Sequence, residues 1–282
     1  MEFVKSPIRY PGAKSRAIPQ IAPLIPDFEE YREPFIGGGS VYLHVRQKYG
    51  KEKKYWINDI NSQLSNFWQQ TQESSDLMLK QIYDWKEQYK EGKQLLQFLR
   101  TNTHRFDRMQ LGSAYYVNKR LSFSGFTRGF SEANFEKSFT KDKIAELKDV
   151  SDLLKNTRIT NLDFQKVIEA PGNDVFLFLD PPYYNIKWDE LYGTRSQNLH
   201  ASFDHYRFAE TMKKCKHKWL ITYDDSNTVR KLFDWANIIP WELTYTSRKV
   251  KTGQELFVSN MDLDLIKNKN KKQLSIEDAW SR

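Results

Sequence analysis

The fold class follows from one stretch of sequence, Val175-Phe176-Leu177-Phe178-Leu179-Asp180-Pro181-Pro182-Tyr183. Consecutive apolar residues bounded by turn residues are typical of a buried β-strand. The prolines end the strand, because proline fixes its own backbone angle and has no N–H to donate to a neighbouring strand. In open α/β sheets, ligands bind beyond the carboxyl ends of the strands. We therefore expect Asp180 to face a binding crevice.

Strand and helix patterns alternate on both sides of this stretch. They predict strands at 54–57, 219–222 and 255–259 and helices at 41–49, 204–216 and 227–236. Such alternation predicts an α/β sheet. Helical stretches without a convincing strand occupy the middle of the chain, at 77–89, 93–100 and 141–154. We therefore expect one α/β domain, formed by 1–61 and 156–282, that is interrupted by a helical insertion at 62–155.

Composition limits the class of protein. The chain has 282 residues, of which 39% are hydrophobic and 15% aromatic, enough to form a packed core. No apolar run approaches the roughly 18 residues of a membrane span, and the first residues contain no apolar core of a secretion signal. Cys215 is the only cysteine, which excludes an internal disulfide framework and a cysteine-based zinc site. We expect a cytoplasmic protein with no membrane partner.

The charge is basic and uneven. There are 44 Lys and Arg against 36 Asp and Glu, a net charge of +8. Basic residues gather in segments 5–16, 100–128, 213–218 and 267–272, and 100–128 holds six of them with a single acid, Asp107. Any one segment could be solvated surface. Together they favour a polyanionic partner, with 100–128 as the region expected to contact it.

A glycine-rich turn precedes the helix predicted at 41–49. Gly37-Gly38-Gly39 allows a tight turn and lets a ligand approach the main chain, and the following helix N-terminus favours an anionic group. Asp59 lies 20 residues after Gly39, at the end of the next predicted strand, where an acid can accept the hydroxyls of a ribose. The pattern is not a clean dinucleotide fingerprint, because Tyr42 occupies the position of the third glycine.

The residues after the strand predicted at 174–179 have a specific chemical capacity. The Asp180 carboxylate and the Pro181 carbonyl could together accept both hydrogens of an exocyclic amino group, while the Tyr183 ring stacks on the base that carries it. A strand-ending turn with a surface tyrosine is the alternative.

These elements together resemble the amino-group DNA methyltransferases, specifically the Dam-like N6-adenine class. The matching segments are Tyr10-Pro11-Gly12-Ala13-Lys14, Glu33-Pro34-Phe35-Ile36-Gly37-Gly38-Gly39-Ser40, Asp59-Ile60-Asn61, Asp163-Phe164, Asp180-Pro181-Pro182-Tyr183, Ser202-Phe203-Asp204, Ile221–Ser226 and Glu255–Asn260. They span nearly the whole chain in the order and spacing of that family. The resemblance implies a Rossmann-like sheet that binds S-adenosyl-L-methionine, with the helical insertion recognising the DNA target.

The resemblance also implies roles for particular residues. Catalysis is expected from Asp180, Pro181, Pro182 and Tyr183. Cofactor binding is expected from Tyr10, Gly12, Lys14, Phe35, Gly37, Gly39, Asp59, Ile60, Asp163, Phe164 and Asp180. DNA binding is expected from Arg105, Arg108, Lys119, Arg120, Arg128 and Phe203. No metal is expected. The implied reaction moves a methyl group to N6 of an adenine flipped out of duplex DNA.

The chain departs from the family at one element. Where Dam proteins carry F-N-G-L-x-R, residues 123–128 read Phe-Ser-Gly-Phe-Thr-Arg, so recognition of GATC is not supported.

The implied partners are double-stranded DNA and a cognate restriction enzyme, with the protein a monomer or a weak dimer. Orphan and restriction–modification settings both stay open.

Other functions remain alternatives. N4-cytosine methylation uses similar geometry, RNA is a weaker substrate option, and a relative of this fold could bind DNA without catalysis. Cytosine-C5 methylation needs a cysteine nucleophile beside a proline, and Cys215 has no such setting. Tyr42 disfavours a dinucleotide-dependent oxidoreductase.

Overall fold

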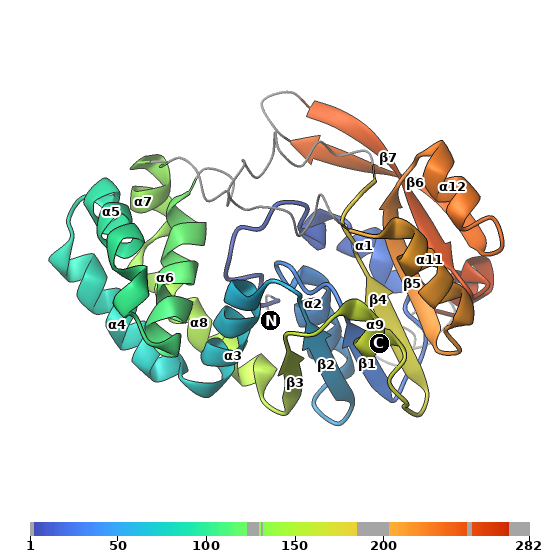
Figure 1. Cartoon of the computed structure of the whole chain (residues 1–282), viewed down its shortest axis with the longest axis horizontal. Helices are drawn as coiled ribbons and strands as arrows, with labels where there is room; N and C mark the ends of the chain where they lie inside the picture. Colours follow the sequence, from blue (N-terminus) through green and yellow to red (C-terminus); the bar gives the residue numbers. More distant parts are fainter. Residues whose placement is uncertain (1–2, 123–129, 131, 185–202, 247–249, 271–282) are drawn as a thin grey trace, which may run out of the picture.

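The computed structural model describes residues 3–122, 130, 132–184, 203–246 and 250–270. Within them, seven strands form one sheet in the order β3-β2-β1-β4-β5-β7-β6 (Figure 1). The strands are β1 (Glu30–Glu33), β2 (Lys54–Asn58), β3 (Thr157–Thr160), β4 (Val175–Leu179), β5 (Lys218–Asp224), β6 (Asn237–Thr246) and β7 (Val250–Ser259). Neighbours among β1 to β5 pair in parallel, and β7 is antiparallel to both β5 and β6. The expected α/β fold is confirmed.

Helices cover the sheet and extend from one end of it (Figure 1). The α-helices are α1 (Ile18–Ile21), α2 (Ser40–Tyr49), α3 (Ser62–Glu73), α4 (Ser75–Gln88), α5 (Gly92–Asn102), α6 (Arg108–Leu121), α7 (Glu132–Ser138), α8 (Lys141–Leu154), α9 (Phe164–Ile168), α11 (His205–Lys214) and α12 (Asn227–Leu232). The 3-10 helices are η1 (Lys14–Arg16), η2 (Ala22–Leu24) and η3 (Thr103–Arg105). None of the helices in the described ranges is both long enough and apolar enough to cross a bilayer.

Strand β4 is buried on both faces. Successive side chains of a strand point to opposite faces of the sheet, and Phe176 and Phe178 accordingly belong to one apolar cluster, with Val41 of α2. Leu177 and Leu179 belong to the other cluster, together with side chains of α9, α11 and α12. This two-sided burial explains why the β4 sequence is a continuous apolar run rather than an alternating one.

The helices between 62 and 155 stand to one side of the sheet (Figure 1). No strand occurs among the described residues of this part of the chain. Its apolar side chains, among them Leu64, Met78 and Leu95, lie in the same core cluster as Tyr31 of the sheet. The helical region and the sheet therefore share a continuous core, and the domain boundaries expected from the sequence stay a prediction.

The strand order creates a switch point between β1 and β4. After β1 the chain continues to β2 and β3 on one side, and it returns to β4 and β5 on the other. Loops that follow adjacent strands on the two sides of such a point diverge and leave a crevice at the carboxyl ends of the strands. The glycine-rich turn follows β1, and Asp180 follows β4. The two segments that the sequence singled out therefore both lie at the carboxyl end of the sheet, one on each of the two strands at the switch point.

Candidate active site

The glycine-rich turn is required by its surroundings. Gly37 and Gly39 have φ angles of 47° and 70°, in the left-handed region that glycine adopts without a steric penalty. A Cβ atom on Gly39 would lie 2.8 Å from the Trp68 ring of α3. The Trp68 indole N–H also donates to the Gly37 carbonyl at 3.2 Å. The packing of this turn against the Trp68 ring, at the N-terminus of α2, therefore requires glycine.

Asp59 lies directly beside this turn, at the end of β2. Its carboxylate accepts the Gly37 N–H at 3.2 Å and the Asn61 N–H at 2.9 Å. Burial raises the pKa of Asp59 to about 6, and the two N–H groups and the charge of Lys119 oppose that rise. The predicted pairing of the glycine turn with Asp59 is present, although the role of Asp59 toward a ligand stays a prediction.

Asp180 is held by two donors from distant parts of the chain. The Lys14 Nζ lies 2.8 Å from both oxygens of the Asp180 carboxylate and also donates to the Gly12 carbonyl at 3.0 Å. The Thr222 hydroxyl of β5 donates to Asp180 at 2.8 Å. Lys14 is buried, whereas the Asp180 side chain is 21% exposed. The carboxylate is therefore fixed in direction and still accessible.

Tyr183 is buried with its hydroxyl engaged. The hydroxyl donates to the Glu255 carboxylate of β7 at 2.7 Å, and the Lys14 Nζ lies 4.9 Å from the ring centroid. Burial and the nearby carboxylates of Asp180 and Glu255 raise the pKa of Tyr183 well above its ordinary value. The tyrosine therefore stays protonated and serves as a hydrogen-bond donor within the protein. Pro181 is buried, and Pro182 is half-buried.

An aromatic cluster lies next to the glycine turn. Phe35, Phe164 and Phe203 pack with ring centroids 5.4 to 5.6 Å apart. Phe203, expected to contact DNA, thus packs against two residues expected to contact the cofactor. Ile60, which follows Asp59, is 46% exposed and does not belong to the core.

Asp163 has two structural partners. It caps α9 by accepting the Gln165 N–H at 3.0 Å, and both terminal nitrogens of Arg207 donate to it, at 3.1 and 2.8 Å. Its expected contact with an adenosine amino group stays a prediction. Tyr10 packs against the glycine turn, because a Cβ on Gly38 would lie 2.9 Å from the Cβ of Tyr10.

The residues expected to bind DNA differ in their access to solvent. Arg105 and Arg108 are exposed, and Arg108 donates to the side chains of Asn66 and Gln69 on α3. Lys119 is only 6% exposed. Its Nζ lies 5.1 Å from the ring centroid of Tyr10, and burial lowers its pKa to about 8. Arg128 lies outside the described residues.

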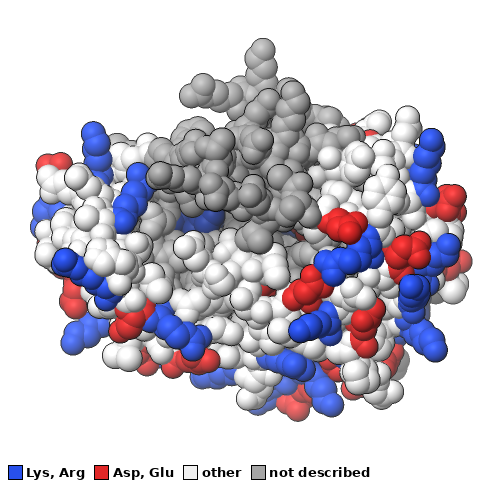
Figure 2. Space-filling view, viewed as in Figure 1, with Lys and Arg blue, Asp and Glu red and all other residues white. Residues whose placement is uncertain are grey.

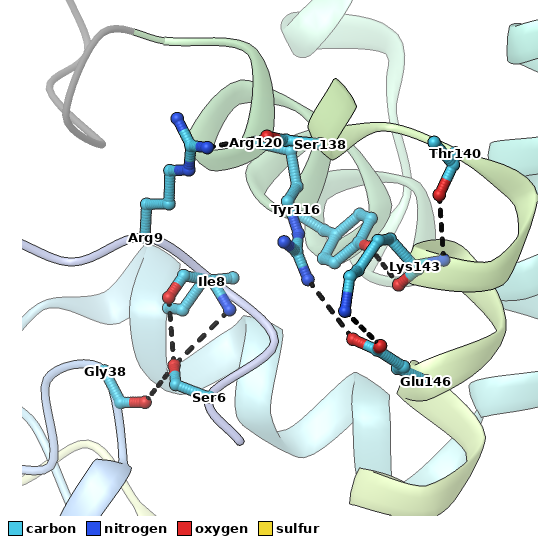
Figure 3. Close-up of polar contacts among 10 residues, drawn as sticks. All are labelled: Ser6, Ile8, Arg9, Gly38, Tyr116, Arg120, Ser138, Thr140, Lys143 and Glu146. Carbon is cyan, nitrogen blue, oxygen red and sulfur yellow. Dashed lines mark hydrogen bonds and ion pairs between the residues drawn. The ribbon is translucent and has the colours of Figure 1, made fainter. Parts of the chain in front are cut away.

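Arg120 is also buried, in the space between the N-terminal segment and helices α6 to α8 (Figure 3). Its guanidinium lies 3.9 Å from the Glu146 carboxylate and 5.5 Å from the Tyr116 ring centroid. Arg9 enters the same space and donates to the Ser138 hydroxyl at 2.6 Å (Figure 3). Burial and the positive charge of Arg120 lower the pKa of Arg9. The two guanidinium groups therefore lie close enough to repel each other.

Surface charges of both signs alternate over the visible face of the described residues (Figure 2). The positive charge that segment 100–128 exposes to a partner is smaller than its formal charge, because Lys119 and Arg120 are buried.

Sequence reasoning assigned no role to several residues that build the site. Thr222 and Glu255 lie in segments that resemble the family, but a hydrogen bond to Asp180 or Tyr183 leaves no local pattern. Trp68 was missed because nothing in a helical stretch indicates that one ring reaches a glycine 29 residues earlier. Among the described residues, no group of three or more His, Cys, Asp or Glu side chains is arranged to hold a metal ion.

Comparisons with known proteins find matches that cover most of the chain. The family model described as D12 class N6 adenine-specific DNA methyltransferase matches residues 10–247. The type II methyltransferase M1.LlaDCHI of Lactococcus lactis subsp. cremoris is 23% identical over 273 residues, covering 89% of this chain and 94% of its own. The type II methyltransferase M.CviBI of Paramecium bursaria Chlorella virus NC1A is 23% identical over 274 residues, with coverage of 94% and 100%. A DNA adenine methylase of Vibrio cholerae serotype O1 is 21% identical over 241 residues, with coverage of 82% and 85%.

Proposed function

Because the chain belongs to the D12 class of N6 adenine-specific DNA methyltransferases, we propose that it methylates N6 of an adenine flipped out of duplex DNA, with S-adenosylmethionine as donor. The roles proposed for individual residues rest on one observation. At the switch point between β1 and β4, the accessible carboxylate of Asp180 lies beyond β4, and the glycine turn with Asp59 lies beyond β1 and β2. This shared end of the sheet supports the inference that the carboxylate and the glycine turn serve one site.

The residues around the glycine turn fit the donor. The glycine turn ends at the N-terminus of α2, where main-chain N–H groups favour an anionic or carboxylate group, and Asp59 is placed to accept ribose hydroxyls. Exposed Ile60 and the aromatic cluster (Phe35, Phe164 and Phe203) offer apolar surface for an adenine ring. S-Adenosylmethionine supplies an electrophilic methyl group when bound. Gly12 and Lys14 lie at the Asp180 end of the crevice, where the methyl group would be presented.

Asp180 and Pro181 would activate the target amine. The lone pair of the adenine N6 is delocalised into the ring, which makes the amine a weak nucleophile. Acceptance of its hydrogens by the Asp180 carboxylate and the Pro181 carbonyl would localise the lone pair and stabilise the positive charge that develops on nitrogen. A carboxylate has about four lone-pair positions, so Asp180 retains acceptor capacity while bonded to Lys14 and Thr222.

DNA would approach over the exposed cations of the helical region. Extrusion of the adenine costs a few kcal/mol, which stacking on an aromatic face such as Tyr183 would offset in part. Arg105 and Arg108 are accessible to backbone phosphates, and such contacts orient a duplex without reading its sequence. The names of the type II relatives favour a restriction–modification setting with a cognate restriction enzyme.

Tritium transfer from methyl-labelled S-adenosylmethionine to duplex DNA tests the assignment. We expect Asp180→Asn to lower the rate at least about 100-fold, the scale of losing one transition-state electrostatic contact, with binding of S-adenosylhomocysteine retained. Asp174→Asn is the matched control, because Asp174 precedes the same strand at its opposite end and pairs with Lys218. Near wild-type transfer by the Asp180 variant would refute the proposed role.

A further inference from the structure

Glu255 of the antiparallel strand β7 contacts the segment that follows β4. Its partner residue on β5 is Asp224, and its partner on β6 is the uncharged Trp241. The Glu255 side chain is buried, and its carboxylate accepts the Tyr183 hydroxyl at 2.7 Å. The bond joins residues 72 positions apart and links the last described strand of the chain to the segment that follows β4.

The Tyr183 ring is held from more than one side. The Glu255 carboxylate holds the hydroxyl, and the Lys14 ammonium lies 4.9 Å from the ring centroid. The Tyr223 ring of β5 packs beside it with centroids 6.0 Å apart. The bond to Glu255 thus fixes the direction of the Tyr183 ring, which is 8% exposed.

We propose that Glu255 is a positioning residue for methyl transfer, which fixes the Tyr183 ring against which the target adenine stacks. The proposal rests on the function proposed above. Its physical basis is that a hydrogen bond to a charged acceptor is stronger and more directional than one between neutral groups. Without this bond, the tyrosine would sample other ring orientations, and the adenine amine would spend less time next to Asp180.

The groups around the site also set the pKa of Glu255. Burial raises the pKa of Glu255 to about 7, and Asp180 and Asp224 add to the rise, while the charge of Lys14 and the bond from Tyr183 oppose it. Glu255 therefore gains its negative charge near neutral pH, and the hydrogen bond that it accepts from the tyrosine becomes stronger as pH rises. We expect kcat to rise with pH through about 7 for this reason.

A double-mutant cycle tests the proposal on the full-length protein with duplex DNA. Glu255→Leu removes the acceptor, and Tyr183→Phe removes the donor. We expect each to lower kcat roughly 10-fold, the scale of one hydrogen bond to a charged group, with KM for S-adenosylmethionine unchanged. The double variant should be no slower than the slower single variant, because each change breaks the same hydrogen bond.

Further variants separate positioning from a structural role. Glu255→Gln keeps an oxygen acceptor, so it should retain more activity than Glu255→Leu, and its kcat should lose the rise through pH 7. It also keeps the test open if the leucine variant does not fold. Glu242→Gln, on the exposed part of β6, is the control and should leave both the rate and the pH profile unchanged.

Independent losses that multiply in the double variant, or a pH profile that Glu255→Gln leaves intact, would overturn the positioning role. Failure of the wild-type protein to methylate DNA would instead refute the proposed function, so the two failures are distinguishable.

Discussion

At the scale of single residues, the site depends on Asp180 and Tyr183 and also on the groups that hold these two side chains in place by hydrogen bonds. Lys14, Thr222 and Glu255 come from η1, β5 and β7, and each donates to or accepts from one of the two. Hydrogen bonds to a charged carboxylate are short and directional. The partners of Asp180 therefore fix the direction from which it can accept from an amine.

Thr222→Val tests this preparation of Asp180. Valine is nearly isosteric with threonine but lacks the hydroxyl that donates to Asp180 at 2.8 Å. We expect kcat to fall roughly 10-fold, the scale of a hydrogen bond to a charged group, and Thr222→Ser to restore much of the rate. Thr211→Val is the control, because that buried hydroxyl donates to the Arg207 carbonyl of its own helix. An unchanged kcat in Thr222→Val would contradict the account.

Asp59 makes stability depend on pH. Burial raises its pKa from 3.8 to about 6, so the folded state binds this proton more tightly than the unfolded state does. That contribution to stability is complete below about pH 4 and is lost as pH rises through about 6. Relative to Asp59→Asn, the free energy of unfolding of the wild type should therefore fall by about 2 kcal/mol between pH 4 and 7. Urea unfolding of both proteins at each pH measures the difference, and parallel pH curves would contradict it.

At the scale of elements, the sequence predicted strands and helices best where burial leaves a strong local pattern. The buried strand β4 and the helix before Gly50 were correctly predicted. Strand β1, Glu-Tyr-Arg-Glu, was missed because it contains charged residues. Its Arg32 is nevertheless buried, since it donates to Glu30 and to the carbonyls of Val167, Ala170 and Pro171. Such compensation depends on distant residues, and no local pattern shows it.

The turn between β1 and α2 predicts a specific consequence of mutation. Gly39→Ala would place a Cβ 2.8 Å from the Trp68 ring in a left-handed conformation. We expect a loss of about 2 to 4 kcal/mol in stability and weaker binding of S-adenosylhomocysteine, because Trp68 and the turn must shift together.

Gly50→Ala is the matched control for that change. Gly50 has a φ of 76° but no atom within 4 Å of its Cβ position. It should lose about 1 to 3 kcal/mol from strain alone and bind the ligand normally. Calorimetry on both variants separates the effects, and normal binding by Gly39→Ala would argue against a ligand at this turn.

At the scale of the whole molecule, the net charge of +8 is distributed less simply than the sequence indicates. The sequence locates basic residues along the chain but not their depth. Lys14, Lys119 and Arg120 are buried near the crevice, where they act on Asp180, Asp59 and Glu146 respectively. Arg105 and Arg108 remain on the surface. The surface charge available for DNA is therefore smaller than the formal count.

This difference in depth predicts different salt dependences. Arg108→Gln should weaken duplex binding and lower the slope of log affinity against log salt by about 0.9, the value for one lost phosphate contact. Lys119→Met should leave the slope unchanged, because the side chain is buried against Tyr10. Lys231→Gln, on α12 at the far end of the molecule from α6 (Figure 1), is the exposed control. Fluorescence anisotropy over a salt series checks all three, and an unchanged slope for Arg108→Gln would contradict the proposed interface.

The proposed activity is methylation of adenine at N6, with Asp180 as the acceptor for the amine. The most direct test is to incubate unmethylated duplex DNA with the protein and S-adenosylmethionine, digest the DNA to nucleosides and identify the methylated base by mass spectrometry. We expect N6-methyldeoxyadenosine from the wild-type protein and none from Asp180→Asn. N4-methyldeoxycytidine as the product, or N6-methyldeoxyadenosine formed equally by both proteins, would contradict the account.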